Sequence, residues 1–120
     1  MLGLRTTIYR VPNLQKAKKW YSKTFKLNPY FENEFYIGFN VKGYELGLEK
    51  ELNKSEKSDN VLSYWGVESI SETLNHFLEE GAKLYHEPMN VGGETVLTSV
   101  KDPWNNVIGF IYNPEFKLSE

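Results

Sequence analysis

The sequence predicts an α+β fold in which a βαβββ module occurs twice along the chain. Residues 4–49 read as a strand, a helix and three further strands, and residues 61–112 repeat that order. Between them lies a polar stretch, EKELNKSEKSDN, with one leucine among charged and small residues. We therefore expect one domain at 1–120, composed of a first module at 4–49, a linker at 50–60, a second module at 61–112 and a tail at 113–120.

The first module begins with a strand at residues 4–11, LRTTIYRV, which is rich in β-branched and aromatic residues. Asn13 is a suitable N-cap for the helix that follows. Apolar residues recur at helical spacing over residues 14–25, and the dipeptide Asn28-Pro29 predicts the end of this helix. Three short strands are predicted after it, at residues 30–32, 35–41 and 44–49.

The second module begins with a strand at residues 61–67, VLSYWGV. Ser69 and Glu72 form a capping box, and the apolar stripe behind them predicts a helix that stops at Gly81. Gly92-Gly93 is typical of a hairpin turn. The remaining strands are predicted at residues 83–87, 94–100 and 107–112.

The last strand follows a tight turn, and the whole segment reads VKDPWNNVIGFIYNP. Asp102-Pro103 opens the turn, since aspartate can bond the backbone ahead of it and proline fixes its own φ. Asn105 tolerates the left-handed conformation that such a reversal requires. Gly109 stands in the middle of the strand, where glycine indicates a close approach to the backbone.

Sequence similarity between the modules supports a duplication. IYRVPNL at residues 8–14 matches YWGVESI at residues 64–70, and YELGL at residues 44–48 matches NVIGF at residues 106–110. The few identities mean that the repeat rests mainly on the order of the elements. In this alignment Gly47 falls on Gly109.

Composition limits the classes of function. Hydrophobic residues make up 40% of the 120 residues and aromatic residues 15%, which suffices for a packed interior. A net charge of −2 gives no reason to expect nucleic acid as a partner, and no apolar run has the length of a membrane span. The sequence has no cysteine. We expect a cytoplasmic protein without a disulfide or thiolate site.

The DPWNN turn with its strand, and the YWGV strand that enters a capped helix, resemble the vicinal oxygen chelate superfamily. Its members include glyoxalase I, extradiol dioxygenases, methylmalonyl-CoA epimerase and the fosfomycin and bleomycin resistance proteins. The resemblance extends from residue 4 to about residue 114 and implies that the modules form a cup of mixed β-sheet with the helices outside. In the turn, Asn105 replaces the glycine of the family pattern Asp-Pro-x-Gly-Asn.

The resemblance also implies where a metal ion would bind. Its enzymes commonly hold a divalent metal with His, Glu or Gln from the first and last strands of each module. Those positions fall here on Thr6, Gly47, Leu62 and Gly109. None of these side chains is a donor that zinc, iron or manganese prefers, so we expect no metal site and no cofactor. A shift of one residue would bring Arg5 or Glu45 nearby, but not a full ligand set.

Two histidines could in principle serve as ligands elsewhere. His76 lies within the second predicted helix and is expected to be a surface or half-buried helical residue. His86 precedes Glu87 on a short strand, and a local hydrogen-bonded pair is the simpler expectation. Neither position predicts a metal site.

Alternation along the strands assigns one set of side chains to the inside of the cup. These expected ligand-binding residues are Thr6, Ile8, Arg10, Glu45, Gly47, Glu49, Leu62, Tyr64, Val107, Gly109 and Ile111. The opposite set packs under the helices and comprises Tyr9, Val11, Leu46, Leu48, Trp65, Val67, Ile108 and Phe110. The inner set is mainly apolar, and its two glycines are expected to enlarge the space, so an apolar or aromatic small molecule is the expected ligand.

Three functions remain compatible with this pattern. The first is a metal-independent small-molecule binder of the bleomycin-resistance type, which we expect to be a homodimer. The second is a glyoxalase-type lyase or isomerase, or a dioxygenase, that uses acid–base groups or a metal site placed differently. Glu45 could be its base if burial raised the pKa, although an ion-paired rim with Arg10 and Glu49 is the simpler expectation. The third is a structural domain whose pocket is filled by its own side chains.

Overall fold

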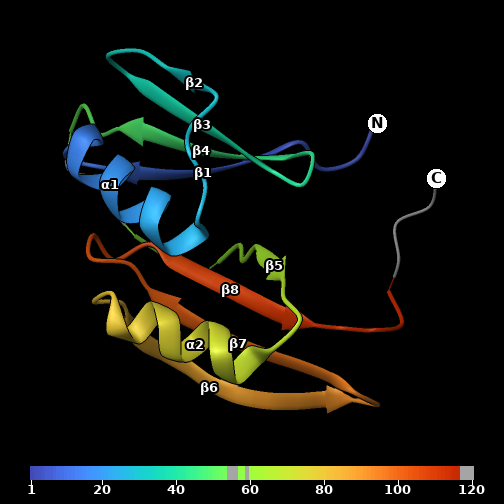
Figure 1. The fold of residues 1–120 in the computed structure, drawn as a ribbon. Helices are drawn as coiled ribbons and strands as arrows, with labels where there is room; N and C mark the ends of the chain where they lie inside the picture. Colours follow the sequence, from blue (N-terminus) through green and yellow to red (C-terminus); the bar gives the residue numbers. More distant parts are fainter. Residues whose placement is uncertain (54–56, 59, 117–120) are drawn as a thin grey trace. The chain divides into compact units, whose positions relative to one another are not determined.

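The computed structural model describes residues 1–53, 57–58 and 60–116 (Figure 1). The chain divides into two compact units, Met1–Glu56 and Lys57–Glu120. Each unit contains a four-stranded mixed sheet and one helix, in the predicted order strand, helix, strand, strand, strand. The predicted α+β class and the repeated module are therefore confirmed. Parts of the expected linker and tail lie outside the described residues.

In the sheet of the first unit, β1 (Thr6–Val11) lies at one edge and β4 (Tyr44–Lys50) lies in the interior. The strand order is β1-β4-β3-β2, with β1 and β4 parallel and the other neighbours antiparallel. The elements are β1 Thr6–Val11, α1 Leu14–Phe25, β2 Phe31–Glu32, β3 Tyr36–Val41 and β4 Tyr44–Lys50.

The second unit repeats this topology with the strand order β5-β8-β7-β6, in which β5 and β8 are the parallel pair. Its elements are β5 Tyr64–Gly66, α2 Ile70–Glu79, β6 Lys83–Gly92, β7 Thr95–Lys101 and β8 Val107–Tyr112. Because the connectivity is the same in both units, the residues of β5 correspond to residues 8–10 of β1.

Both helices begin at the predicted caps. The side chain of Asn13 accepts a hydrogen bond from the Lys16 N–H at 3.0 Å, and Ser69 Oγ accepts one from the Glu72 N–H at 3.2 Å. Helix α2 ends as predicted, because Gly81 has a φ of +98° and Ala82 N–H bonds Phe77 O at 3.0 Å. Within the described residues, neither helix is both long and apolar enough to cross a membrane.

Helix α1 ends earlier than the sequence predicts. The expected end was Asn28-Pro29, but Lys26 already has a left-handed backbone with a φ of 57°. The Leu27 N–H then bonds the Ser22 carbonyl at 3.1 Å, which satisfies a terminal carbonyl of the helix. The chain therefore leaves the helix through a lysine C-cap, before the proline can act.

Two strands of the second unit also differ from the prediction. The strand predicted at 61–67 is limited to Tyr64–Gly66, so Leu62 precedes it. Strand β6, predicted at 83–87, continues to Gly92 through Pro88. It lies at the sheet edge, where a proline removes no ladder hydrogen bond, and its pairing with β7 shows three register shifts.

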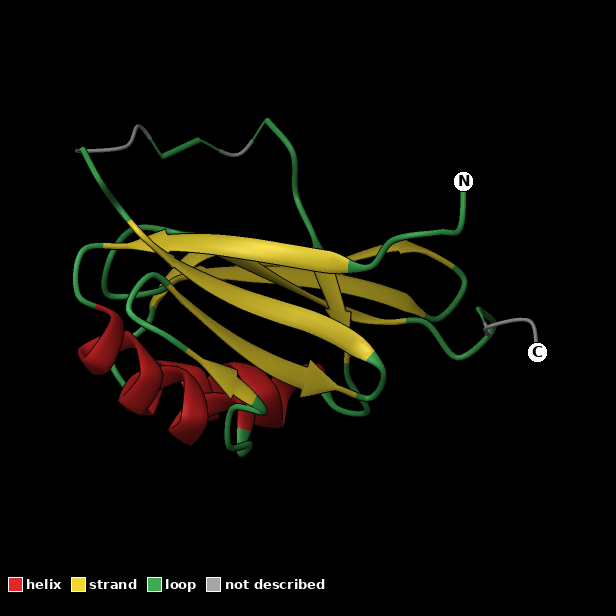
Figure 2. Cartoon of the chain, turned by 90° about the horizontal axis from the view of Figure 1, so that it is seen from above, coloured by secondary structure: helices red, strands yellow, loops and turns green. Residues whose placement is uncertain are grey.

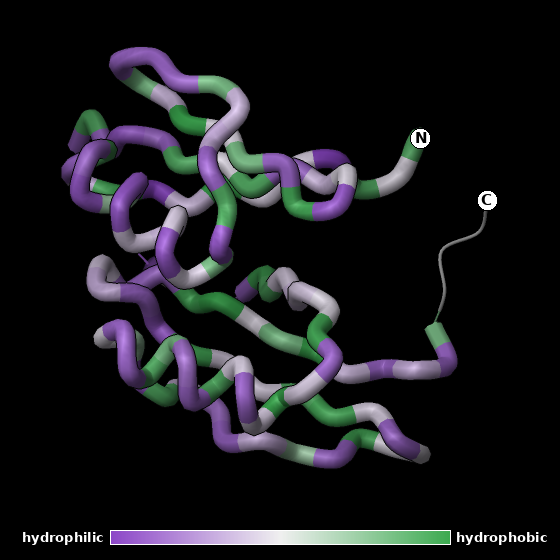
Figure 3. Tube along the Cα trace, in the orientation of Figure 1, coloured by the Kyte–Doolittle hydropathy of each residue, from purple (hydrophilic) through white to green (hydrophobic). Residues whose placement is uncertain are grey.

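In each unit the helix covers one face of the sheet (Figure 2). The residues of β1, β4 and β8 that were predicted to pack under the helices are buried. Figure 3 shows hydrophobic and hydrophilic residues interspersed along the chain of both units. Val11, Leu46, Leu48 and Ile108 are each 0% exposed. The predicted burial of one face of β1, β4 and β8 is thus confirmed, and the alternate side chains of these strands lie on the face away from the helix.

The turn before β8 forms as its sequence predicts. The carboxylate of Asp102 is buried and accepts hydrogen bonds from the N–H groups of Trp104 and Asn106, both at 2.8 Å. Asn105 adopts a φ of 70°, the left-handed conformation expected where it replaces glycine. This turn fixes where β8 begins and therefore where Gly109 lies.

Candidate functional site

The two parallel strand pairs place equivalent residues side by side. Ile8 of β1 pairs with Gly47 of β4, and Tyr64 of β5 pairs with Gly109 of β8. These are the matches that the internal sequence repeat predicts. Gly47 and Gly109 therefore occupy the same position in their two modules.

The four positions that the resemblance assigns to a metal ion do not fit one. Thr6 and Gly47 lie on β1 and β4, and Gly109 lies on β8, whereas Leu62 precedes β5. A hydroxyl, an isobutyl group and two glycines supply no imidazole, thiolate or carboxylate. Across residues 1–53, 57–58 and 60–116, no three His, Cys, Asp or Glu side chains gather in a metal-binding arrangement.

The space above the two glycines is filled, which corrects the expectation that they enlarge a cavity. A Cβ atom on Gly47 would lie 2.6 Å from Tyr36 Cζ. A Cβ atom on Gly109 would lie 2.6 Å from Tyr64 Cδ1 and 2.7 Å from the Ser63 carbonyl oxygen. Each glycine is thus required because a tyrosine ring lies directly on its backbone. The space above these two glycines is thus filled by the protein's own side chains, as the alternative of a structural domain predicts.

Glu45 on β4 is the centre of a hydrogen-bonded cluster on the exposed face of the first module. Its Oε1 accepts hydrogen bonds from Thr6 Oγ1 at 3.0 Å and from the Tyr36 hydroxyl at 2.8 Å. Its Oε2 accepts a short hydrogen bond from the Tyr30 hydroxyl. Three hydroxyl groups therefore hold one half-buried carboxylate.

These bonds shift the pKa values of the partners in opposite directions. The Tyr30 hydroxyl, followed by those of Tyr36 and Thr6, lowers the pKa of Glu45, although partial burial opposes this. Burial and the Glu45 carboxylate raise the pKa of Tyr36, and the carboxylate also raises that of Tyr30. The raised pKa that a general base at Glu45 would need is absent, and Glu45 is a carboxylate at neutral pH.

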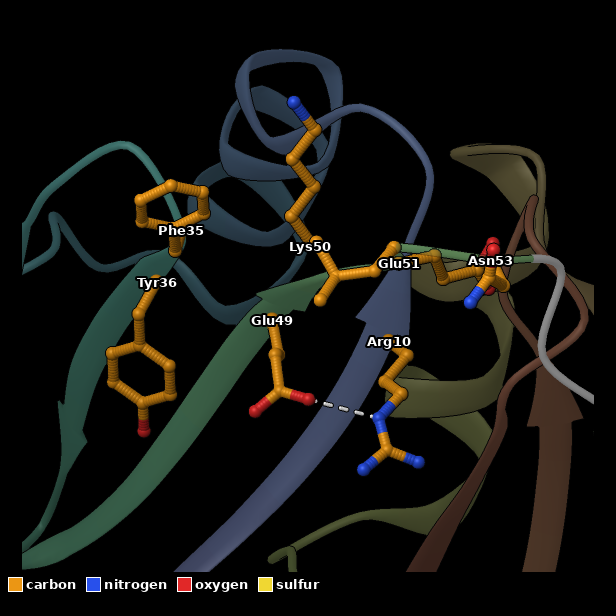
Figure 4. A pocket seen from close by; sticks show the side chains of 8 residues that line it. Arg10, Phe35, Tyr36, Glu49, Lys50, Glu51 and Asn53 are labelled. Atoms are coloured by element: carbon orange, nitrogen blue, oxygen red, sulfur yellow. Dashed lines mark hydrogen bonds and ion pairs between the residues drawn. The ribbon is translucent and has the colours of Figure 1, made fainter.

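Only part of the expected ionic rim forms. Arg10 Nε and Glu49 Oε1 are 2.9 Å apart, and their side chains are 60% and 38% exposed (Figure 4). Glu45 does not join this pair, because its oxygens bond hydroxyl groups instead. An exposed pair of this kind adds little stability.

A pocket of about 600 Å³ lies beside the Arg10–Glu49 pair, at the ends of β1 and β4 (Figure 4). In Figure 4, Tyr36, Glu49 and Arg10 point to one side of the sheet, and Phe35 and Lys50 point to the other. The pocket is lined by Arg10, Phe35, Tyr36, Glu49, Lys50, Glu51, Leu52 and Asn53.

The second module has a pocket of about 620 Å³ at the equivalent place, the ends of β5 and β8. Gly66 corresponds to Arg10 in the repeat, and Ile111 corresponds to Glu49. The lining is Tyr64, Gly66, Val67, Glu68, Ile111, Tyr112, Asn113, Pro114 and Phe116. The two modules thus carry pockets at the same position but of different chemistry, one charged and one mainly apolar.

The remaining predicted residues are distributed around these features. Ile8 is 46% exposed on β1, and Val107 is half-buried on β8. Val67 was expected under the helix but lines the second pocket, because β5 ends at Gly66 and the alternation ends with it. Leu62 lies outside both pockets.

The histidines do not form a ligand set. His86 was expected to pair with Glu87, but its Nδ1 lies 2.8 Å from Ser99 Oγ on the neighbouring strand. His76 is half-buried in the last turn of α2, as expected.

Sequence reasoning identified Tyr64, which covers Gly109, but missed Tyr36, which covers Gly47, and the nearby rings of Tyr30 and Phe31. Tyr30 precedes β2 and Phe31 begins it, and a strand of two residues shows no alternation; Tyr36 is the first residue of β3. Phe116 follows β8 in the predicted tail. A signal was present in the aromatic enrichment of residues 30–36, YFENEFY, but it gave no direction for the rings.

Comparisons with known proteins agree with this architecture. The model of the Glyoxalase/Bleomycin resistance protein/Dioxygenase superfamily matches residues 3–110. No curated protein sequence matches the chain.

Solved structures with the same fold include a glyoxalase-related enzyme from Fulvimarina pelagi, with 14% identity and a TM-score of 0.79, covering 99% of this chain and 94% of that chain. The fosfomycin resistance protein FosX from Listeria monocytogenes has 16% identity and a TM-score of 0.78, with 96% of each chain covered. A glyoxalase/bleomycin resistance protein from Albidiferax ferrireducens T118 has 18% identity and a TM-score of 0.73, covering 92% and 98%. At these identities the likeness concerns the fold.

Gly109→Ala is expected to destabilise the protein by about 1–3 kcal/mol, because the added methyl group meets both a ring and a backbone carbonyl. Urea unfolding measures this cost. Gly66→Ala is the matched control in the same sheet, since no atom lies within 4 Å of its Cβ position. A Gly109→Ala variant as stable as Gly66→Ala would show that the Tyr64 ring does not lie on Gly109.

Glu45 is expected to make stability fall as the solution is acidified. Its folded pKa lies below the ordinary value of 4.5, so its contribution is full above pH 4.5 and is lost as the pH falls through the folded pKa. Glu45→Gln should reduce the free energy of unfolding at about pH 7 and flatten its decline toward about pH 3. Glu32, whose pKa Gln15 and Lys18 lower, leaves a residual slope.

The measurement is urea unfolding over this pH range, with Glu34→Gln as an exposed control in the same module. An unchanged slope in Glu45→Gln would contradict the assignment of the acid-sensitive contribution to Glu45.

Proposed function

The chain belongs to the Glyoxalase/Bleomycin resistance protein/Dioxygenase superfamily, and from this premise we propose that it binds a small apolar or aromatic molecule without a metal ion. The observation that carries this proposal is the apolar pocket of the second module. Its volume of about 620 Å³ is within the usual range for small-molecule sites. Tyr64 and Ile111, two residues that the sequence assigns to the ligand, contribute to its lining.

The lining favours a flat hydrophobic ligand. Tyr64 and Tyr112 present aromatic rings with a polar end, and Phe116 adds a ring that is 74% exposed. Ile111 and Pro114 add aliphatic surface to the lining. Rings prefer offset or edge-on contact with other rings, which suits an aromatic guest. Glu68 is the charged residue of this lining, and it can orient a polar substituent.

Binding without a metal follows from the chemistry of the donor positions. In both modules the last-strand position is a glycine beneath a tyrosine, so a ligating side chain there would first have to displace the ring. Thr6, the first-strand position of module one, donates its hydroxyl to Glu45. The residues at these positions therefore serve packing and hydrogen bonding.

The enzyme alternative is less well supported at Glu45. A carboxylate whose pKa is lowered by three hydroxyl groups is a weaker base than a free glutamate. Turnover of hemithioacetal or catechol substrates by metal-supplemented protein, lost in Glu45→Gln, would support that alternative instead.

A thermal-shift screen of aromatic and aliphatic fragments tests the binding function. A fragment present at about 100 times its Kd should add roughly 2.7 kcal/mol to the free energy of unfolding. The shift should persist in the presence of EDTA. Phe116→Ala should weaken binding severalfold, whereas Val61→Ala, an exposed residue of the same unit outside the pocket, should not.

If EDTA abolished every thermal shift caused by the fragments, the proposal that binding needs no metal ion would be contradicted. An equal affinity of Phe116→Ala and the unaltered protein would place the ligand elsewhere. A screen without any shift would favour the alternative of a structural domain.

We further propose that the protein is a homodimer formed through the β6 edge. Strand β6 is ten residues long, ends the second sheet and exposes Leu84, Met89 and Val91. An exposed edge strand offers unpaired backbone groups, and a two-fold axis would satisfy both copies at once.

Light scattering after size-exclusion chromatography should give twice the chain mass of 14.0 kDa. Met89→Asp should shift the protein toward the monomer, because it places a charge in the apolar interface. Leu52→Asp, which changes a more exposed apolar residue of the other unit, is the control. A monomeric mass for the unaltered protein would disprove this arrangement.

A further inference from the structure

The exposed face of the first module carries three aromatic rings around one carboxylate. We define this aromatic cluster as Tyr30, Phe31 and Tyr36 with Glu45. Phe31 pairs with Gly38 across β2 and β3, and Gly38 pairs with Gly47 across β3 and β4. Tyr36 and Glu45 lie two residues from Gly38 and Gly47 and share their face, opposite to α1, and the Tyr30 ring lies against Gly38 on that face.

Two adjacent glycines form the floor of the cluster. A Cβ atom on Gly38 would lie 3.1 Å from Tyr30 Cε1 and 2.9 Å from Glu45 Oε2. The ring of Tyr36 covers Gly47 in the same way. The absence of two side chains thus lets both rings lie low on the sheet while their hydroxyls reach Glu45 from two sides.

The rings are open to solvent. Tyr30 is 63% exposed and Phe31 is 47% exposed. The ring centroids of Phe31 and Tyr36 are 6.4 Å apart, and the planes are inclined at 50°. Two inclined faces beside a third exposed ring leave aromatic surface available to a ligand.

The charge of the cluster is negative and has no cation partner of its own. Among the residues that the structure describes, only hydroxyl groups bond Glu45. Arg10 forms its ion pair with Glu49, and Lys50 points to the other side of the sheet (Figure 4). An aromatic face also attracts positive charge through its quadrupole. Both components of the cluster therefore favour a cation.

The hydrogen-bond count determines which kind of cation fits. Each carboxylate oxygen has about two acceptor positions, and Oε1 of Glu45 already accepts two hydrogen bonds. Oε2 accepts one, from Tyr30. Too few acceptors remain for a metal ion or for the three N–H donors of a primary ammonium group. A weakly hydrated organic cation without N–H groups needs no such acceptors, because its methyl groups contact the rings directly.

We propose that the aromatic cluster of the first module is a binding site for an organic cation of the quaternary or methylated ammonium class. The cluster consists of residues of the first module alone, and none of them lines the apolar pocket of the second module.

The test compares choline with its neutral isostere 3,3-dimethylbutan-1-ol, which has the same shape without the charge. Both are titrated into the full-length protein and followed by backbone amide NMR. Choline should shift the amides of Phe31, Tyr36, Gly38 and Glu45, and its Kd should be at least about tenfold lower than that of the isostere. Equal affinities of the two compounds would overturn the proposal.

Variants separate the charge from the rings. Glu45→Gln should weaken choline binding about tenfold and leave the binding of the isostere unchanged. Tyr30→Leu should weaken choline binding severalfold. The fold should persist in this variant, because the Tyr30 side chain is 63% exposed. Phe35→Leu is the control, since this neighbouring ring points to the other side of the sheet (Figure 4).

An unchanged choline affinity in Tyr30→Leu would overturn the proposal even if Glu45→Gln failed to fold. Phe116→Ala should not alter choline binding. Failure of the apolar pocket in the fragment screen and failure of the cation site are therefore distinguishable.

Discussion

Close contact between a tyrosine ring and a strand backbone determines how the exposed face of each module is built. Tyr36 lies on Gly47 and Tyr64 lies on Gly109, and neither ring could remain there if the glycine had a side chain. In the second module the parallel pairing of β5 and β8 sets this contact, because it brings Tyr64 beside Gly109. In the first module the ring comes from the antiparallel neighbour β3, on which Tyr36 lies two residues from Gly38, the partner of Gly47. The rings therefore cover the backbone of these two glycines on that face.

Duplication has given the two modules the same framework and different surfaces. Arg10 and Glu49 form an ion pair in module one, and their counterparts in module two are Gly66 and Ile111. The pocket at the strand ends is charged in the first case and apolar in the second, with nearly equal volumes. Backbone topology therefore fixes where a pocket forms, whereas a few outward-facing side chains decide what it can bind.

The sequence allowed prediction of those features that depend on local chemistry or on period. The caps at Asn13 and Ser69 and the bonded turn at Asp102 follow from short-range hydrogen bonding, and the alternation along β4 and β8 assigned their faces correctly. The contacts of Tyr30 and Tyr36 with Glu45 could not be predicted, because they depend on how β2 and β3 pair beside β4 in the sheet. The extent of β5 was also missed, since three residues carry too little pattern.

The environment of Glu45 shows why the identity of a residue does not determine its chemistry. A glutamate on the inner face of this superfamily invites assignment as a metal ligand or a base. Here the hydroxyls of Thr6, Tyr30 and Tyr36 keep it ionised and occupy most of its acceptor positions. Glu45 is therefore a fixed negative charge beside aromatic rings. Such a group attracts a cation through its charge and through the ring faces, and it is poorly suited to proton transfer. The same three hydroxyl groups that deprive Glu45 of basicity therefore make it suitable for holding a weakly hydrated cation.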